Sequence, residues 1–448
     1  MAKSRFLTLA ALAALVVSAC GGSAAPSATI APTPSAATET ATTAPEPSGE
    51  VEFWAWSTNV EEMVALFEQE NPGIKVKLVN NGSGATQYEK LQVAFAAGSG
   101  APDVAMVEFP YITQYALEGN IVPLDNLGGA GVVDDFADSV RAQATVNGKL
   151  YGVPLDSAPM AYGYREDLLV AAGITTLPST WQEFADAAAK YHSTDTKAWI
   201  ANSPISDGTF IQMMWAAGLS PVKVDGTTIT LDFTSADTEQ LLSFWVDLAK
   251  KGDVGTIPAW TPEWNQGFAS GALSGWLMPG WGPVILKSAA PDTSGKWRVS
   301  RLPSADGTRS SSEWGGSAYT VTAQSKNPAA AARLAIWLNH EPMAYEKLFE
   351  LTGSFPVLKA FASDPKIIDA AFEYFGGQPV NSVFAEEQAA VNRSWQWSPF
   401  QTTVASVVAE QTLAAQNGKV TPAEALAKIQ GELVDYAKGQ GFDVREGS

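Results

Sequence analysis

Strand-like and helix-like segments alternate along the chain after its first 49 residues, and this limits the fold more than any other feature. Residues 51–54, 74–79 and 103–107 carry the short apolar runs or apolar–polar alternation of strands. Helix-period patterns lie between them, at residues 60–67 and 88–97. The βαβαβ order predicts a parallel sheet with helices on both of its faces.

The same alternation continues to the C-terminus. Three Thr-x-x-Glu capping boxes predict helix starts at residues 58–61, 180–183 and 421–424. Further strands are expected at 275–277 and 318–321. Of the 448 residues, 46% are hydrophobic and 17% charged, which is typical of a globular protein. The 399 residues after position 49 exceed one core, so two α/β lobes are expected.

The N-terminus has the pattern of an export signal. Lys3 and Arg5 precede an apolar run at 6–17, which is too short to span a bilayer. Small residues then lead to Cys20, the only cysteine, and this resembles the lipobox of bacterial lipoproteins. We expect a signal peptide at 1–19 and lipidation of Cys20; an ordinary secretory signal or a buried N-terminal helix is the alternative.

A tether is predicted between the lipid and the folded body, over residues 20–49. Of the 29 residues from 21 to 49, 26 are Ala, Ser, Thr, Pro or Gly. Such a segment buries too little apolar surface to offset its ordering entropy, so we expect it to be disordered.

Charge and composition exclude several functions. The formal net charge is −19, and no basic stripe is present, which argues against nucleic acid as a partner. One cysteine and two histidines leave no basis for a thiolate or histidine metal centre, so we expect no metal and no cofactor. No GxxxxGK[ST] phosphate loop occurs either.

Tryptophan is the main chemical signal, with 15 residues in the chain. Those at helical apolar positions, such as Trp181 and Trp245, are expected to pack in the core. Others lie at strand ends or in loops rich in Gly and Pro, where binding sites are commonly built: Trp56, Trp264, Trp281, Trp314 with Gly315 and Gly316, Trp395 and Trp397. Flat indoles suit the C–H faces of a sugar and carboxylates or amides suit its hydroxyls, so the set predicts a carbohydrate cleft.

Several motifs, taken in order, carry a family resemblance. They are VEFWAW at 51–56, KLQVAFAAGSGAPDV at 90–104, GKLYGVP at 148–154, YREDL at 164–168 with LPSTWQEF at 177–184, and PGWG at 279–282. Together they resemble the solute-binding lipoproteins of bacterial ABC sugar importers, the maltose-binding-protein class. The resemblance covers essentially all of the chain after the tether.

The resemblance implies the type II periplasmic-binding-protein fold, α/β with two discontinuous lobes, each a mainly parallel sheet flanked by helices, and a cleft at the hinge. Residues 50–156 with 315–376 would form lobe one. Residues 157–314 with 377–448 would form lobe two. The implied partners are a carbohydrate, the permease subunits of an ABC transporter and the membrane, through the N-terminal lipid. The implied location is the outer face of the cytoplasmic membrane.

The resemblance also implies site positions. The loop after the first strand contributes ligand contacts, here Trp56, Ser57 and Asn59. The end of the third strand contributes a polar group, Glu108, and the first crossing contributes a carboxylate, Asp156. Stacking indoles match Trp281, in Pro-Gly-Trp order rather than Gly-Pro-Trp, and Trp397. Thr58 and Asn59 replace the acid and lysine common in this class, which argues against maltose as the ligand.

Two other functions compete with sugar binding. A glycosidase needs two suitably spaced carboxylates, and Glu108, Asp156, Glu263 and Glu313 could supply them. The chain lacks the eight strand–helix units of a barrel hydrolase, so we expect no enzyme. A binder of another solute, such as a polyamine, would use a similar two-lobed body, and the acidic charge leaves a cationic ligand open.

Overall fold

The computed structural model describes residues 46–447 except 58, 83, 309 and 353–354. The predicted signal peptide, Cys20 and most of the tether therefore lie outside the described residues. Within the described part of the chain, no helix is both long and apolar enough to cross a membrane.

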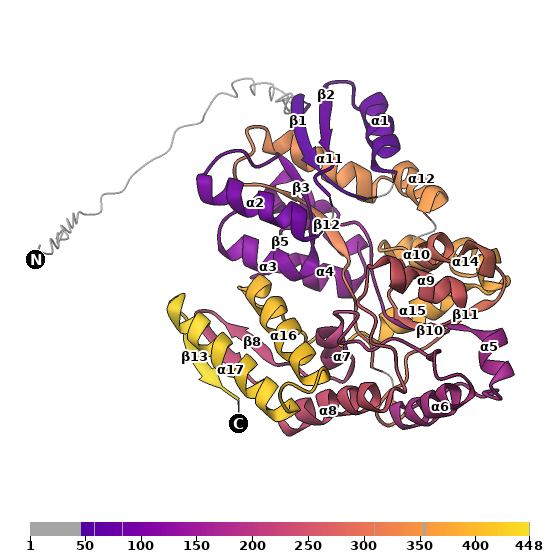
Figure 1. Ribbon diagram of the computed structural model, residues 1–448. Coiled ribbons are helices and arrows are strands. Elements are labelled where there is room, and N and C mark those ends of the chain that lie inside the picture. The colour runs from indigo at the N-terminus through magenta and orange to yellow at the C-terminus, as the bar shows by residue number, and fades with distance from the viewer. Residues whose placement is uncertain (1–45, 58, 83, 309, 353–354, 448) are drawn as a thin grey trace, which may run out of the picture. The chain divides into compact units, whose positions relative to one another are not determined.

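Strands and helices alternate over the first described elements, up to residue 117 (Figure 1). The expected alternation then breaks down, because four strands follow one another at 145–165 and the elements at 328–439 are all helical. The strands are β1 (Gly49–Trp54), β2 (Ile74–Val79), β3 (Val104–Glu108), β4 (Thr145–Val146), β5 (Lys149–Leu150), β6 (Gly152–Pro154), β7 (Ala161–Arg165), β8 (Val222–Asp225), β9 (Thr228–Leu231), β10 (Gly275–Met278), β11 (Trp297–Ser300), β12 (Ser317–Val321) and β13 (Asp443–Glu446). The helices are α1 (Val60–Glu70), α2 (Ala85–Ala97), α3 (Phe109–Leu117), α4 (Asp138–Ala144), α5 (Glu166–Ala171), α6 (Trp181–Thr194), α7 (Phe210–Ala216), α8 (Ala236–Lys251), α9 (Pro262–Ser270), α10 (Gly282–Ala289), α11 (Pro328–His340), α12 (Pro342–Thr352), α13 (Lys359–Ala362), α14 (Pro365–Ile368), α15 (Val380–Ala390), α16 (Gln401–Gln416) and α17 (Pro422–Gly439).

Lobe one is the part built on a five-stranded sheet of order β2-β1-β3-β12-β6. The predicted parallel pairing is confirmed for β1 with β2 and for β1 with β3. Strand β12 arrives from much later in the chain and pairs antiparallel with both β3 and β6. It places Ser317 opposite Glu108, so a crossing between the lobes meets the end of β3, where the site is expected.

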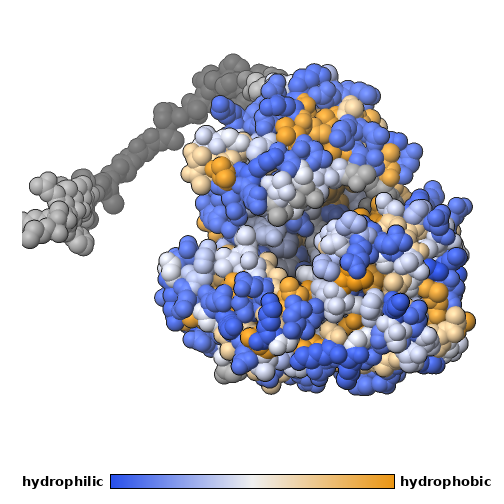
Figure 2. Space-filling view, in the orientation of Figure 1, coloured by the Kyte–Doolittle hydropathy of each residue, from blue (hydrophilic) through white to orange (hydrophobic). Residues whose placement is uncertain are grey.

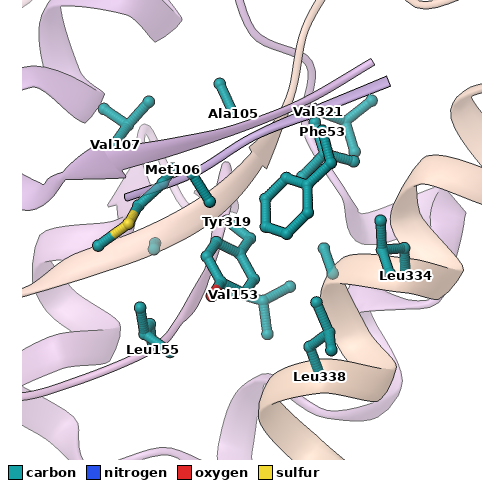
Figure 3. Packing of buried hydrophobic residues seen from close by; sticks show 14 of the residues in the cluster. Phe53, Ala105, Met106, Val107, Val153, Leu155, Tyr319, Val321, Leu334 and Leu338 are labelled. Carbon is teal, nitrogen blue, oxygen red and sulfur yellow. The ribbon is translucent and has the colours of Figure 1, made fainter. Parts of the chain in front are cut away.

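Buried side chains of distant segments hold lobe one together (Figure 3). Phe53 of β1 meets Tyr319 of β12 edge to face, with ring centroids 4.9 Å apart. Leu334 and Leu338 of α11 point at the same pair, as Figure 3 shows. A Phe53→Ala change removes the ring and leaves a cavity, which should cost about 3–5 kcal/mol of stability.

Lobe two is the part built on two three-stranded sheets, β10-β7-β11 and β13-β9-β8. The expected mainly parallel sheet is wrong here, because β7 pairs antiparallel with both β10 and β11, and β8 pairs antiparallel with β9. Among the strand pairs that the structure describes in this lobe, β13 with β9 is parallel. An alternation of strands and helices predicts parallel pairing only where neighbouring strands are joined by a helical crossover. The paired strands of lobe two are not joined in this way.

The observed starts of three helices can be compared with the three predicted capping boxes. Those at residues 180–183 and 421–424 are confirmed, with reciprocal hydrogen bonds at the start of α6 and α17. For the box at 58–61, Thr58 lies outside the described residues. The described helix α1 begins at Val60, so Glu61 is its second residue, and the residue before it, Asn59, is left-handed with φ 62° and makes no side-chain cap hydrogen bond.

The lobe boundaries stay a prediction, although the core clusters bear on them. Buried residues of the lobe-one cluster run to Leu155 and resume at Ala318, in keeping with the crossings expected near 156 and 314. Phe375, in contrast, belongs to the same buried cluster as Trp264 and Trp276 of lobe two, and Phe372 packs against that cluster. The side chains therefore change lobes before the crossing predicted at 376–377.

Candidate functional site

The carboxyl end of β3 opens into a cavity between the lobes, here called the inner cavity, of about 170 Å³. Lobe one contributes Glu108 and Tyr111 to its wall, and the second crossing contributes Trp314 and Gly315. The side facing them is formed by α7 and α16 with Trp397 just before it. Figure 2 shows the surface hollowed between these two parts of the body.

Glu108 is held rigidly at this end of the cleft. Its Oε2 accepts a 2.7 Å hydrogen bond from the Tyr88 hydroxyl, and its backbone N–H donates to the same hydroxyl oxygen at 3.0 Å. Tyr88 is itself packed against Tyr111, with ring centroids 4.3 Å apart. Burial raises the pKa of the Glu108 carboxyl, and the Tyr88 bond opposes part of that rise. Glu108 is thus positioned to accept hydrogen bonds from a ligand.

Asp156 supplies a second carboxylate where the chain first leaves lobe one. Its Oδ1 accepts a 2.7 Å hydrogen bond from the Ser317 backbone N–H, which ties the two crossings together. Burial, together with the charges of Glu108 and Glu313, raises its pKa to about 7, although the Ser317 bond opposes the rise. Asp156 is therefore poised to change its charge near neutral pH.

Gly315 and Gly316 allow the second crossing to pass these acids. Both are left-handed, with φ 80° and 82°, a conformation that glycine adopts without a Cβ penalty. A Cβ on Gly316 would lie 2.8 Å from the Phe109 ring. A Cβ on Gly315 would lie 3.6 Å from both Glu108 Oε1 and Trp281 Nε1, so these two groups face the same point.

A group of tryptophans from lobe two lies beside that point. Trp281 and Trp314 have ring centroids 5.5 Å apart, and the Trp281 indole N–H donates to the Trp314 carbonyl at 3.2 Å. Trp260 contacts both rings, at 5.9 and 6.0 Å. Both Trp281 and Trp314 are half-buried, so their rings keep some surface for a ligand.

Trp264 does not fit the site predicted for it. Its side chain is 0% exposed and packs against Phe268 and Trp276, while its indole N–H donates to Asp207 Oδ1 at 3.1 Å. Its position in a Pro-rich segment suggested a loop, but Pro262 begins α9 and turns Trp264 inward. It supports the tryptophan group from behind instead of lining the cleft.

Trp260 is a residue that the sequence reasoning missed. It is 54% exposed and left-handed, with φ 66°, which is strained for a bulky side chain. Strain of this kind is retained where the surrounding structure enforces it, and that often occurs at ligand sites. Its place between two prolines, Pro258 and Pro262, is the signal that could have found it.

A second and larger hollow, here called the outer groove, continues between the lobes and measures about 540 Å³. Trp395 and Trp215 form one wall and are stacked, with centroids 5.3 Å apart and planes 11° from parallel. Trp397 meets Trp215 edge on at 5.5 Å and lines both the groove and the inner cavity. Thr113 of α3 and Asn147 belong to the lobe-one wall.

Gln143 of α4 links the lobes at Trp397. The Trp397 indole N–H donates to Gln143 Oε1 at 3.0 Å, and Gln143 Nε2 donates to Glu313 Oε2. Ser157 donates to Glu313 Oε1 at 3.0 Å and accepts from Gln388 at 2.9 Å. Glu313 is 0% exposed, and burial raises the pKa of its carboxyl, so it belongs to the hinge and not to the cavity wall.

The loop after β1 lies beside this arrangement. Trp56 packs edge on against Tyr88, with centroids 6.1 Å apart, and the Ser57 hydroxyl lies 3.2 Å from the Tyr319 hydroxyl. Neither residue, nor Asn59, is among those that line the inner cavity. Trp56 and Ser57 thus contact the acid end of the site through Tyr88 and Tyr319.

The predicted site residues are thus only partly brought together. Glu108, Trp314, Gly315 and Trp397 line the inner cavity, and Asp156, Trp281 and Gly316 adjoin it. Trp395 lines the outer groove, and Trp264 is in the core. Their roles in binding stay predictions. No group of three His, Cys, Asp or Glu side chains able to hold a metal occurs among the residues that the structure describes.

Comparisons with known proteins define the class. The chain matches a family described as bacterial extracellular solute-binding protein over residues 62–373, more than half of its length. The chain belongs to this family, as its motifs predicted. An arabinooligosaccharide-binding protein of Bacillus subtilis (strain 168) is 26% identical over 326 residues, which cover 69% of this chain and 74% of that protein.

Solved structures agree on the two-lobed fold. An ABC transporter associated binding protein from B. animalis subsp. lactis Bl-04, in complex with β-1,6-galactobiose, is 30% identical with a TM-score of 0.81. The match covers 89% of this chain and all of that one. The galacto-N-biose-/lacto-N-biose I-binding protein of Bifidobacterium longum is 24% identical, with a TM-score of 0.78 over 90% of this chain and 100% of its own, and supports the fold.

Proposed function

We propose that this protein captures a carbohydrate between its lobes and delivers it to the permease of an ABC transporter. The observation that carries the proposal is the inner cavity, in which the fixed carboxylate of Glu108 faces the indoles of Trp314 and Trp397. A carboxylate accepts hydroxyl hydrogens and indoles cover C–H faces, which together match a sugar. The sugar-binding relatives support the same ligand class.

Binding is coupled to closure of the lobes. A sugar that rests on the tryptophans of lobe two offers its hydroxyls to Glu108 and Asp156 at the lobe-one side. The closed form gains these hydrogen bonds in addition to stacking, so the ligand shifts the population toward closure. Cross-lobe bonds such as Thr402 to Gln114, at 3.2 Å, are then available to hold the closed form that the permease receives.

The proposed role involves no chemistry on the sugar. Two of the four candidate carboxylates do not suit an acid–base pair. Glu313 is enclosed by Ser157 and Gln143, whereas Glu263 is exposed on α9. Glu108 accepts the Tyr88 hydroxyl at Oε2, which leaves Oε1 to accept a hydrogen bond from the ligand. These contacts favour a binding protein over a glycosidase.

A thermal-shift screen followed by calorimetry tests the function. The mature protein would be mixed with galactose, β-1,6-galactobiose, arabinobiose, maltose and spermidine. We expect a raised melting temperature and one-to-one binding for at least one sugar, with the sugar recovered unchanged by chromatography. Binding of spermidine alone, or steady release of shorter sugars, would overturn the proposal.

The lipid anchor is a separate part of the proposal. Cys20 would carry the lipid and hold the protein at the outer face of the cytoplasmic membrane, close to the permease. Fractionation of cells that express the native chain or Cys20→Ser tests it. We expect the native chain in the membrane fraction and the variant in the medium or periplasm; equal distribution of the two would contradict the anchor.

A further inference from the structure

Asp207 is a buried carboxylate of lobe two that none of the proposed ligand contacts uses. It is 4% exposed, and its Oδ1 accepts hydrogen bonds from Asn202 Nδ2 at 2.6 Å and from the Trp264 indole N–H at 3.1 Å. Burial raises the pKa of its carboxyl to about 7, although both hydrogen bonds oppose the rise. Both donors are neutral, and an ionised carboxylate buried among neutral partners costs stability. A residue that served stability alone would be neutral here, which points to another role for Asp207.

The chain on either side of Asp207 forms part of the inner cavity. Ile205 comes before it and Gly208 directly after it, and both line that cavity together with the first residues of α7. The Asp207 backbone N–H donates to the Ser203 carbonyl at 3.0 Å, which closes the turn that carries the carboxylate. The hydrogen bonds of the Asp207 side chain therefore tie this wall of the cavity to the interior of lobe two.

The two partners of Asp207 also hold the segment that carries Trp260. Asn202 donates to the Ile257 carbonyl at 2.8 Å and accepts from the Ile257 backbone N–H at 3.1 Å. Trp264 packs against Trp260, with ring centroids 5.1 Å apart, and Trp260 in turn contacts the two half-buried indoles beside the inner cavity. Because Trp260 is left-handed, its backbone is strained and has to be held in place by its surroundings.

We propose that Asp207 is a positioning residue of the binding site. Through its two hydrogen-bond partners, it fixes the segment that carries Trp260 relative to the wall of the inner cavity. Asp207 is not among the residues that line that cavity, so it acts on a ligand through these neighbours and not by contact. The inference rests on the proposed function, because the ligand that it serves is the one held between the lobes.

A double-mutant cycle tests the role of Asp207. Calorimetry would compare the native protein, Asp207→Leu, Trp264→Phe and the double variant, with galactose, β-1,6-galactobiose, arabinobiose and maltose as ligands. Asp207→Leu removes the acceptor and keeps a side chain of similar length, and it should weaken the best-binding sugar about tenfold. In the Trp264→Phe background the same change should cost less than about threefold, because the indole N–H is already absent. Asp207→Asn keeps an Oδ1 acceptor and should stay within about twofold of the native affinity.

An NMR signal distinguishes positioning from a general loss of stability. In ligand-free protein labelled with nitrogen-15 tryptophan, the signal that Trp264→Phe lacks is the Trp264 indole N–H. This signal should shift with a midpoint near pH 7 in the native protein, as Asp207 ionises beside it, and should not do so in Asp207→Asn. A Trp264 signal that does not shift near pH 7 in the native protein would contradict the inference.

Trp245→Phe is the matched control for the cycle. Trp245 is also 0% exposed and in lobe two, but its ring packs against Trp181 and Phe184. The variant should leave sugar affinity unchanged, and Asp207→Leu should keep its full effect in that background. If Asp207→Leu binds as tightly as the native protein, or weakens binding equally with and without the Trp264 indole, the positioning role is wrong while sugar binding stands. If none of the four sugars binds the native protein, the proposed function is wrong and the inference falls with it.

Discussion

The acidic side and the tryptophan side of the cleft are held in place by different forces. Glu108 and Asp156 are each fixed by a hydrogen bond of 2.7 Å, from Tyr88 and from the Ser317 backbone. Trp281 and Trp314 are placed mainly by ring packing within lobe two. Hydrogen bonds are directional and stacking is broad, so the acids should set which sugar fits and the indoles should supply most of the affinity.

The largest effect should come from Trp397, which belongs to both hollows. Trp397→Ala should weaken the best-binding sugar by about 30-fold or more, because it removes a central aromatic contact. Calorimetry measures the change, and Trp397→Phe, which keeps a ring, should lose less. A loss below threefold for the Ala variant would mean that the tryptophan side does not dominate affinity.

Glu108→Gln should weaken binding about tenfold. The amide keeps the shape of the carboxylate but loses the charge that strengthens hydrogen bonds from sugar hydroxyls. The effect should differ among sugars of equal size and so appear as altered selectivity in a competition assay. Glu263→Gln, at an exposed position on α9, is the matched control and should change nothing.

Binding should also depend on pH, by about fivefold between pH 5.5 and 8. Burial raises the pKa of Asp156 to about 7, and sugar hydroxyls that donate to it favour its ionised form. Affinity should therefore rise with pH, and binding should release protons near pH 7. Calorimetry in buffers of different ionisation enthalpy detects the protons, and Asp156→Asn should abolish most of the dependence.

The stability of the ligand-free protein should change in the opposite direction. Asp156 and the buried Asp207 both have pKa values raised to about 7, from an ordinary value of 3.8. The folded state then holds more protons than the unfolded state between about pH 4 and 7, so the free energy of unfolding falls as pH rises through that window. Denaturant melts at several pH values should show that the free energy of unfolding falls less steeply with pH in Asp207→Asn than in the native protein. A rise in the free energy of unfolding with pH would contradict both raised pKa values.

The smallest effect should come from Gln143, which touches Trp397 without lining the inner cavity. Gln143→Met removes the acceptor for the Trp397 indole N–H and one donor to Glu313, so the ring is less firmly oriented. We expect a loss of affinity of about two- to threefold together with a lower melting temperature. A loss as large as that of Trp397→Ala would mean that the lobes close through Gln143 and not through the ligand.

Local features of the fold were predictable from the sequence. The capping boxes at 180–183 and 421–424 involve residues three apart, and the order of β1, β2 and β3 follows from a repeated short crossover. The antiparallel insertion of β12 was not predictable, because its partners on β3 and β6 lie far away in the chain. Pairing over such distances leaves no local pattern.

The site was predictable in composition but not in detail. Trp260 and Trp264 both lie beside Pro262, yet one is 54% exposed and the other fully buried. What separates them is the contact of Trp264 with Asp207, whose position depends on the packing of lobe two. Glu108, which the family resemblance implied for the end of the third strand, lines the inner cavity, and its role in binding stays a prediction.

A crystal structure of the mature protein grown with its best-binding oligosaccharide tests the central claim most directly. The account predicts density for an intact sugar between the lobes, with hydroxyls within hydrogen-bond distance of Glu108 and a ring face against an indole of the cleft. Density for the sugar elsewhere on the surface, with Glu108 and Trp397 untouched, would contradict it.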